Sequence, residues 1–291
     1  MTLVPYIPGA SLGGRRADLG SVTLGAVDAA GVAWHLQGLD GWDGSDLSAG
    51  YQPREADHGA WAAPVYLRQR PVTITGKIEA SGVTALDAAI EQLIAASSFA
   101  DTTLTVYESI PKQATVRRSG PPLIKPITDR IAEYSVLVTA ADPRRYSTDL
   151  QAQSAGLPSV TGGVTLPLTM PLTITAGTSS GQISLSNAGS MSTRPTFTID
   201  GPVADPVIVV QYPDSTVVQL AFSDTLGAGD QLVIDTAARS VVLNGSVSRR
   251  GYLSVARWPV IPPTSTVTVQ WTASSYDSAA LLTGTCRSAW M

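Results

Sequence analysis

The sequence predicts a mainly β protein, in which an amino-terminal β domain with one packed α-helix is followed by a carboxy-terminal β-sandwich of the jelly-roll type. Three observations indicate this fold class. Apolar and polar residues alternate over residues 71–78, the period of a strand buried on one face. A convincing helical period occurs only over residues 86–97. The second half holds short β runs separated by turn signals, of which Asn244-Gly245 is the strongest.

The amino-terminal half reads as strands arranged around that one helix. Strands are expected over residues 21–27, 32–36, 72–78, 102–107 and 130–140. Thr84 is expected to be the N-cap of the helix, whose apolar residues form one stripe. Residues 39–51 form a Gly, Asp and Ser loop around Trp42, and a tryptophan in such a loop is usually buried against another part of the protein.

The length of 291 residues fits two domains better than one. Residues 150–163 carry no charge and contain one proline, so we expect a linker there. The expected domains are therefore 1–149, with the helix, and 164–291. In the second, the β runs fall at 195–200, 207–212, 216–222, 231–235, 240–243, 252–255 and 265–271, the spacing of a sandwich.

The composition gives information about the charge of the protein surface and not about a catalytic activity. Charged residues make up 14% of the chain, against about 25% in average globular proteins. This indicates either a surface covered in an assembly or a small-residue β protein that is poor in charge in any setting. The net charge of −4 argues against a surface that coats nucleic acid or binds an anionic membrane.

Targeting and cysteine signals are sparse. Cys286 is the one cysteine, so no intramolecular disulfide and no cysteine metal site are expected. The first residues lack a signal peptide pattern, and no window has the roughly 20 apolar residues of a membrane span. We expect a soluble chain that is made in the cytosol and does not insert into a membrane.

No group of residues in the sequence is a strong candidate for a catalytic site. Ser11, in Gly-Ala-Ser-Leu-Gly, matches a nucleophile elbow but lacks the preceding strands and following helix that the elbow needs. Asp57 and His58 could form an acid–base pair, although a turn with a local hydrogen bond explains them better. The three carboxylates of residues 40–46 lack calcium-loop spacing. We expect no catalytic residue, no cofactor, no metal and no enzyme activity.

The central stretch carries a resemblance to a known family. An acidic corner with a glycine over 55–59, an arginine-rich strand of the form R-x-R-x-V-x-I-x-G over 68–76, and the amphipathic helix over 86–97 resemble the opening of siphophage distal tail proteins. The similarity continues through 142–147 and 195–271, so it touches both halves in discontinuous blocks. It looks most like the minor tail proteins of actinobacteriophages.

The resemblance implies a structural virion protein of the tail tip, made in the host cytoplasm. Such proteins form a homohexameric ring whose amino-terminal domains close around a lumen and whose galectin-like outer sandwiches project outward. The implied partners are other copies of the chain, the tail tube protein, and tail-tip hub or tape-measure proteins. DNA would pass through the lumen without specific binding. No long insertion resembling an extra carbohydrate-binding module is present.

Two sets of residues are the candidate sites that follow from the resemblance. The candidate ring interface comprises Arg54, Asp57, His58, Arg68 and Arg70. The candidate contact surface of the outer domain comprises Tyr252, Trp258 and Trp271.

Two alternatives from other classes stay open. A carbohydrate-binding β-sandwich would recognise host cell-wall glycans through exposed aromatic residues such as Tyr252 and Trp258, and would be a monomer. A hydrolase would use Asp57 and His58.

Overall fold

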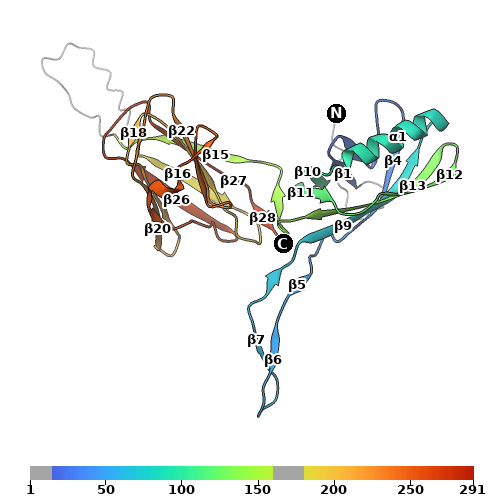
Figure 1. Cartoon of the computed structure of the whole chain (residues 1–291), viewed down its shortest axis with the longest axis horizontal. Coiled ribbons are helices and arrows are strands. Elements are labelled where there is room, and N and C mark those ends of the chain that lie inside the picture. The colour runs from blue at the N-terminus through green and yellow to red at the C-terminus, as the bar shows by residue number, and fades with distance from the viewer. Residues whose placement is uncertain (1–14, 160–179) are drawn as a thin grey trace, which may run out of the picture. The chain divides into compact units, whose positions relative to one another are not determined.

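The computed structural model describes residues 15–159 and 180–291. These residues fall into two compact units (Figure 1): unit 1 comprises 15–148 with Met291, and unit 2 comprises 149–159 with 180–290. The candidate nucleophile Ser11 lies outside the described residues. No helix in the described ranges is both long and apolar enough to cross a membrane.

Unit 1 is built on one large antiparallel sheet. Its strands follow the order β2-β1-β10-β11-β13-β9-β4-β3, with β12 paired to β13 and β14 paired to β11. The elements are β1 (Arg16–Leu19), β2 (Val22–Leu24), β3 (Ala26–Val27), β4 (Ala33–Asp40), β9 (Arg70–Glu79), α1 (Val83–Ala96), β10 (Thr102–Tyr107), β11 (Lys112–Arg118), β12 (Leu123–Thr128), β13 (Ile131–Ala140) and β14 (Arg145–Ser147).

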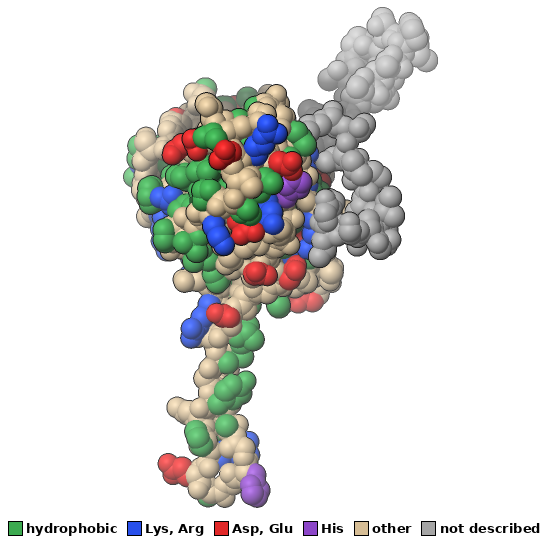
Figure 2. Space-filling model, turned by 90° about the vertical axis from the view of Figure 1, so that its right-hand side faces the viewer, with side chains coloured by type: hydrophobic (Ala, Val, Ile, Leu, Met, Phe, Trp, Pro, Cys, Tyr) green, Lys and Arg blue, Asp and Glu red, His purple; other side chains and the backbone are tan. Residues whose placement is uncertain are grey.

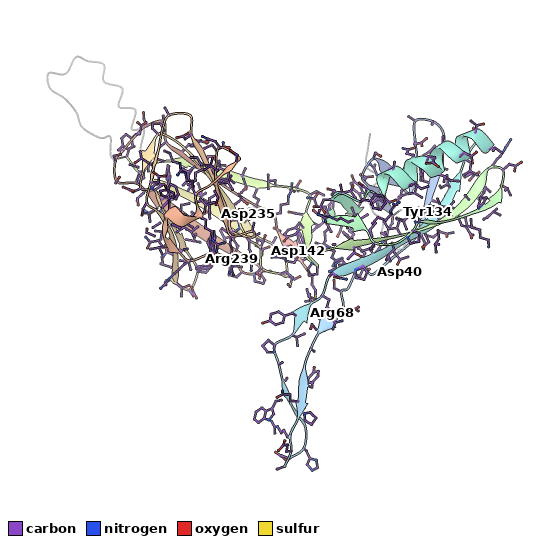
Figure 3. The ribbon with its side chains drawn as sticks, viewed as in Figure 1. Asp40, Arg68, Tyr134, Asp142, Asp235 and Arg239 are labelled. Carbon is purple, nitrogen blue, oxygen red and sulfur yellow. The ribbon has the colours of Figure 1, made fainter. Side chains whose placement is uncertain are left out.

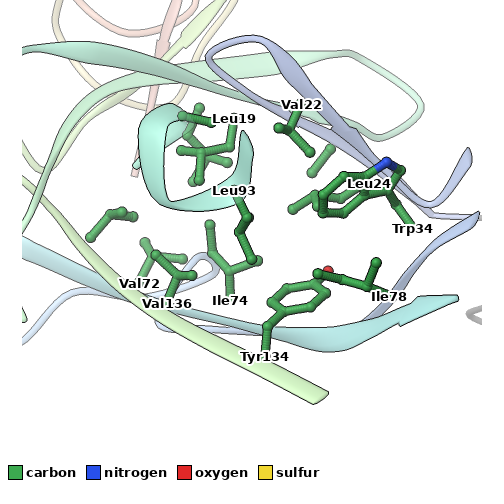
Figure 4. Close-up of a cluster of buried hydrophobic side chains, with 14 of the residues drawn as sticks. Leu19, Val22, Leu24, Trp34, Val72, Ile74, Ile78, Leu93, Tyr134 and Val136 are labelled. Carbon is green, nitrogen blue, oxygen red and sulfur yellow. The ribbon is translucent and has the colours of Figure 1, made fainter. Parts of the chain in front are cut away.

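The centre of this sheet is the pair β9 and β13, joined over ten register positions from Ile131↔Glu79 to Ala140↔Arg70. Side chains alternate across a strand, so one face is buried and the other is not. On β9 the buried positions include Val72, Ile74 and Ile78, which confirms the predicted strand. Their face and that of β13 meet α1 and β1–β2 in one apolar core (Figure 4).

The helix is where the sequence predicts it, but it begins earlier. α1 starts at Val83 and is preceded by Gly82 as N-cap, with no side-chain capping bond. Thr84 therefore lies inside the first turn, and its assignment as N-cap is wrong. The buried side of α1, formed by Leu86, Ala89, Leu93 and Ala96, lies on the sheet.

Between β4 and β9 the chain leaves the sheet as a long hairpin, residues 43–69, which we call the arm (Figure 1). Its strands are β5 (Leu47–Ser48), β6 (Tyr51–Pro53), β7 (Ala60–Ala62) and β8 (Tyr66–Leu67). The sequence predicts only a loop and a polar corner here. The arm is two-stranded, since β5 pairs with β8 and β6 with β7.

Unit 2 is a β-sandwich. One sheet has the order β15-β27-β17-β22-β23-β24, the other β16-β26-β19-β20-β25, and β18 pairs with β21. The elements are β15 (Gln151–Gly156), β16 (Gln182–Asn187), β17 (Thr196–Asp200), β18 (Val203–Ala204), β19 (Val207–Gln211), β20 (Val217–Phe222), β21 (Thr225–Leu226), β22 (Gln231–Asp235), β23 (Ser240–Leu243), β24 (Val247–Ser248), the 3-10 turn η2 (Arg250–Tyr252), β25 (Leu253–Ala256), β26 (Ser265–Thr272), β27 (Leu281–Cys286) and β28 (Ala289–Trp290).

The structure corrects the expected linker. Residues 151–156 form β15, which pairs with β27 from Gln151↔Cys286 to Gly156↔Leu281. The first half of the segment 150–163 is therefore a strand of unit 2, although it lacks charge and large apolar residues. It is held by pairing to a strand more than a hundred residues away, a contact that composition does not reveal. Residues 160–163 lie outside the described residues.

Candidate functional site

The arm is a continuous two-stranded ribbon. Backbone hydrogen bonds close it along its length: Arg68 N donates to Asp46 O at 2.8 Å, Ala63 N to Gly50 O at 2.9 Å, and Arg54 N to Gly59 O at 3.1 Å. A two-stranded ribbon by itself is marginally stable in water. An arm of this length is therefore expected to gain stability from a surface outside its own fold.

The tip of the arm is a small polar cluster. The Arg54 guanidinium lies 4.5 Å from the Trp61 ring centroid and 3.4 Å from Asp57 Oδ2. Asp57 Oδ1 accepts a hydrogen bond from the backbone N–H of His58 at 2.7 Å. The other histidine, His35, is on β4 and contacts Glu79 at 3.3 Å. Asp57 and His58 thus form a turn, and the structure does not bring the two histidines together.

Large apolar side chains lie uncovered along the arm. Figure 2 shows hydrophobic side chains exposed along this hairpin. The exposed fractions are 67% for Tyr51, 65% for Trp61 and 68% for Tyr66, and Leu47 and Val65 are at least half exposed. Contiguous exposed apolar surface on a protein usually marks an interaction site, and Tyr, Trp and Arg dominate such sites. The sequence signal for this surface is the aromatic content of 51–66, and the predicted interface residues do not include these rings.

The root of the arm is fixed by Arg70, which is fully buried. Its Nη1 donates to the carbonyl oxygens of Trp42 at 2.5 Å and Gly41 at 3.2 Å, and its Nε donates to Pro143 O at 2.8 Å. Burial, and then the nearby Arg145 charge, lower the pKa of Arg70 to about 10. Arg70 therefore cannot lie at a ring interface as predicted. It joins both ends of the arm to the sheet.

Trp42 is a second anchor at the root, and the prediction that it is buried is confirmed. Its Nε1 donates to Glu108 Oε1 at 2.7 Å, while Lys112 Nζ lies 2.6 Å from Glu108 Oε2. Burial opposes ionisation of Glu108, but the hydrogen bonds from Lys112 and Trp42 hold its pKa below the ordinary value. Of the predicted interface residues, Arg68 is exposed where the arm meets the sheet (Figure 3).

The outer-domain candidates do not form one surface. Trp271 is fully buried, and its Nε1 donates to the carbonyl oxygens of Ala155 and Gly156 at 3.1 Å each. It is a core residue, so its assignment to a contact surface is wrong. Tyr252 is 43% exposed, with the Arg249 guanidinium 4.9 Å from its ring centroid. Trp258 is partly exposed, with Arg250 5.9 Å from its ring centroid.

The described residues offer few groups for metal binding or thiol chemistry. Over 15–159 and 180–291, no group of three or more His, Cys, Asp or Glu residues could hold a metal ion. The thiol of Cys286 is buried, and burial raises its pKa to about 11. A thiol with so high a pKa is a poor nucleophile at neutral pH.

The fold defines a class of two-unit β proteins, with a helix-covered sheet that extends an arm and a following sandwich. No protein-family model and no curated protein matches the sequence. Among solved structures, the Dit protein of phage SPP1 is similar over 88% of this chain and 93% of its own, with a TM-score of 0.61 and 14% identity. It is described as a paradigm of the hub adsorption apparatus in phages that infect Gram-positive bacteria. A chain of the phage P2 baseplate, in its activated conformation with Ca, covers 90% of this chain and 99% of its own, with a TM-score of 0.49 and 8% identity.

The chain therefore has the fold of a Dit protein across both units. The predicted fold class, mainly β with one helix and a following sandwich, is confirmed. The resemblance to distal tail proteins is confirmed at the level of fold.

Proposed function

We propose that this chain is a distal tail protein of a siphophage, a structural component of the virion tail tip. In this proposal it forms a homohexameric ring that joins the tail tube to the tail-tip or baseplate proteins, and DNA passes through the ring. The observation that carries the proposal is the Dit fold shared over both units. The net charge of −4 agrees with a passage that does not hold DNA.

In the proposed ring, the arm is the main contact between copies. Arg54, Asp57, His58 and Arg68 all lie on it. The same hairpin carries the three uncovered aromatic rings Tyr51, Trp61 and Tyr66. One side of a standard protein interface uses about 20–30 residues, which is close to the length of the arm. Closed rings arise when each copy offers one surface and accepts another, and an arm suits such a head-to-tail contact.

The test is the mass of the purified protein, measured by light scattering at two concentrations and followed by negative-stain images. The proposal expects a closed six-subunit ring that is favoured at the higher concentration. A variant with residues 45–67 replaced by a short turn keeps Trp42 and Arg70, so it should fold and remain a monomer. A full-length protein that stays monomeric at both concentrations, and that shows no rings, contradicts self-assembly.

A second function rests on a separate observation in unit 2. Tyr252 and Trp258 both present part of their rings to solvent next to arginines, and aromatic faces of this kind stack on sugars. A glycan-binding sandwich would bind cell-wall fragments as a monomer, and Tyr252→Ala would weaken that binding. Binding that is unchanged in Tyr252→Ala and Trp258→Ala would remove this alternative.

A further inference from the structure

The outer face of the unit 1 sheet, opposite α1, carries a shallow trough that crosses four strands. The strand registers place residues in rows across β12, β13, β9 and β4. Three lining residues, Leu123, Ser135 and Thr75, form one such row, which Gly38 of β4 continues. The trough has a volume of about 570 Å³, with Gln37 and Pro122 also in its lining.

Small residues keep the trough open. A Cβ at Gly38 would lie 2.8 Å from Thr75 Oγ1. A side chain at Gly38 would therefore fill space over Thr75 on this face. Gly76 points to the other face of the sheet, where a Cβ would lie 2.4 Å from the Tyr134 hydroxyl in the core. The open floor of the trough thus depends on Gly38 in β4, at a position where glycine otherwise weakens a strand.

The rows on either side of the trough form its two rims, which differ in charge. One rim is charged, with Lys77 Nζ 3.3 Å from Glu133 Oε1 and Lys125 opposite Glu133. The other rim contains Leu137 and Thr73, which the register sets side by side. The floor between them bears the hydroxyls of Thr75 and Ser135, both partly exposed to solvent. The floor is thus uncharged, with two hydroxyls and an exposed Leu123 at one end.

These properties complement the arm. Interface cores are depleted of charge and enriched in Tyr and Trp, and the ring N–H or O–H of these residues usually finds a partner once buried. Trp61, Tyr51 and Tyr66 have uncovered rings with such a donor, and the trough offers the hydroxyls of Thr75 and Ser135 as acceptors. An uncharged floor of this kind suits the burial of an aromatic ring whose N–H or O–H needs an acceptor.

The arm of the same copy does not cover this trough, because no residue of 43–69 lies in its lining. Trp61 and Thr75 lie on opposite sides of Arg70 along one extended stretch of chain. At about 3.3 Å per residue, they are roughly 45 Å apart along that stretch. The buried Arg70 holds the point where the arm leaves the sheet, and the arm extends from there as a free hairpin (Figure 1). The occupant must be another molecule, and a second copy of the chain brings a matching arm.

We propose that the arm of one copy lies across the trough of a second copy, with the Trp61 ring against Leu123 and over Thr75 and Ser135. This inference rests on the proposed self-assembly and specifies the surface that receives the arm. It makes the contact head-to-tail, because the arm and the trough are different surfaces of each copy.

A cysteine pair tests the contact directly. One preparation carries Trp61→Cys and a second carries Ser135→Cys, and the two are mixed under mild oxidation. The natural Cys286 is buried and serves as an unreactive background. A disulfide-linked dimer is expected in the mixture and not in either preparation alone. A linked species that forms equally in a single preparation overturns the proposed pairing.

A filled trough gives an independent measurement. Ser135→Arg places a long side chain in the trough without entering the core, because Ser135 points outward. We expect the concentration for half-maximal assembly, measured by light scattering, to rise by about tenfold or more, the effect of losing a hot-spot contact. The matched control is Thr103→Arg, an exposed strand residue on β10, which should assemble like the wild type.

The two failures are distinguishable. If rings form, Ser135→Arg assembles normally and no mixed disulfide appears, the trough is not the receiving surface while the proposed ring stands. If the wild type forms no oligomer at any concentration and no mixed disulfide appears, both the ring and the arm contact fail. If purified tail tube protein or a glycan fragment, and not a second copy, protects Ser135→Cys from a thiol reagent, the occupant is that molecule and the inference is wrong.

Discussion

The arm and β9 are consecutive parts of one chain, yet they obtain their order in different ways. On β9 the side chains alternate between a buried face and a half-exposed face, and the buried face meets α1 in the core of unit 1. On the arm almost every residue from 46 to 66 is exposed, including three aromatic rings. The extended backbone of β9 is thus stabilised by the core of unit 1, whereas the extended backbone of the arm is stabilised by the hydrogen bonds between its two strands. This difference is what the proposed role of the arm as a contact between copies requires.

The largest effect on stability should come from emptying the core under β9. Ile74 is fully buried, and Ile74→Ala removes methylene groups and leaves a cavity. We expect the free energy of unfolding to fall by about 2–5 kcal/mol in urea titrations. Thr73→Ala, a change on the outer face of the same strand, is the control and should cost far less. An equal loss in both variants would contradict the assignment of the two faces.

The next effect concerns the junction between the two regions. Arg70→Met leaves the carbonyl groups of Gly41, Trp42 and Pro143 without their donor. We expect a loss of roughly 2–4 kcal/mol in the free energy of unfolding, since buried acceptors lose their partners. The arm should also become more sensitive to limited proteolysis, because its root is no longer fixed. Arg68→Met, at an exposed arginine two residues away, is the matched control. Equal proteolysis of the two variants would refute the role of Arg70 at the root.

A smaller, pH-dependent effect is expected at the second anchor of the root. The pKa of Glu108 is lowered in the folded protein, so its ionised form adds stability above the ordinary value of 4.5. That contribution is lost as pH falls from about 4.5 through the lowered folded pKa. Glu108→Gln should cost about 1–2 kcal/mol at pH 7 and flatten the acid dependence of unfolding. A variant as acid-sensitive as the wild type would show that other carboxyl groups control this range.

The smallest change in stability should follow from the arm itself. Trp61→Ala removes a ring that is 65% exposed and touches Arg54. We expect the free energy of unfolding of the monomer to change by no more than about 0.5 kcal/mol, as for other surface substitutions. The same variant should assemble poorly, by light scattering. A large loss in the free energy of unfolding of the monomer would mean that the arm packs on its own copy. The arm would then be stabilised by a core, as β9 is.

The sequence predicts α1, the central strands of unit 1 and seven strands of unit 2 because their signals are local. The alternation around Ile74, the stripe of α1 and the Asn244-Gly245 turn each involve residues within a few positions of one another. The N-cap is predicted two residues too late, because the first backbone bond of α1 runs from Leu86 N to Gly82 O at 2.9 Å and needs no side-chain cap. The existence of the helix is thus predicted more reliably than the residue at which it begins.

The candidate site is predicted less well, because exposure is not a local property. Arg68 and Arg70 look alike in the sequence, yet one is exposed and the other is fully buried beneath carbonyl groups of distant residues. Tyr252 and Trp271 are both aromatic residues in β-rich text, but Trp271 points into the sandwich. A shift of one residue in strand register would turn a buried side chain such as Trp271 to the opposite face of its sheet, and the sequence around it does not set that register by itself.

By itself, the sequence determined the class of the fold and the segments that form β9, β13 and α1. Hydrophobic periodicity and turn residues are properties of neighbouring positions, so they can be recognised without the tertiary structure. Only the tertiary structure decided that residues 43–69 leave the sheet as an arm and that Arg70 and Trp42 fix its root. Those outcomes depend on contacts with Glu108 and Pro143, far away in the chain. Such contacts exist only after the strands have paired, because a buried donor must find its acceptor within the assembled sheet.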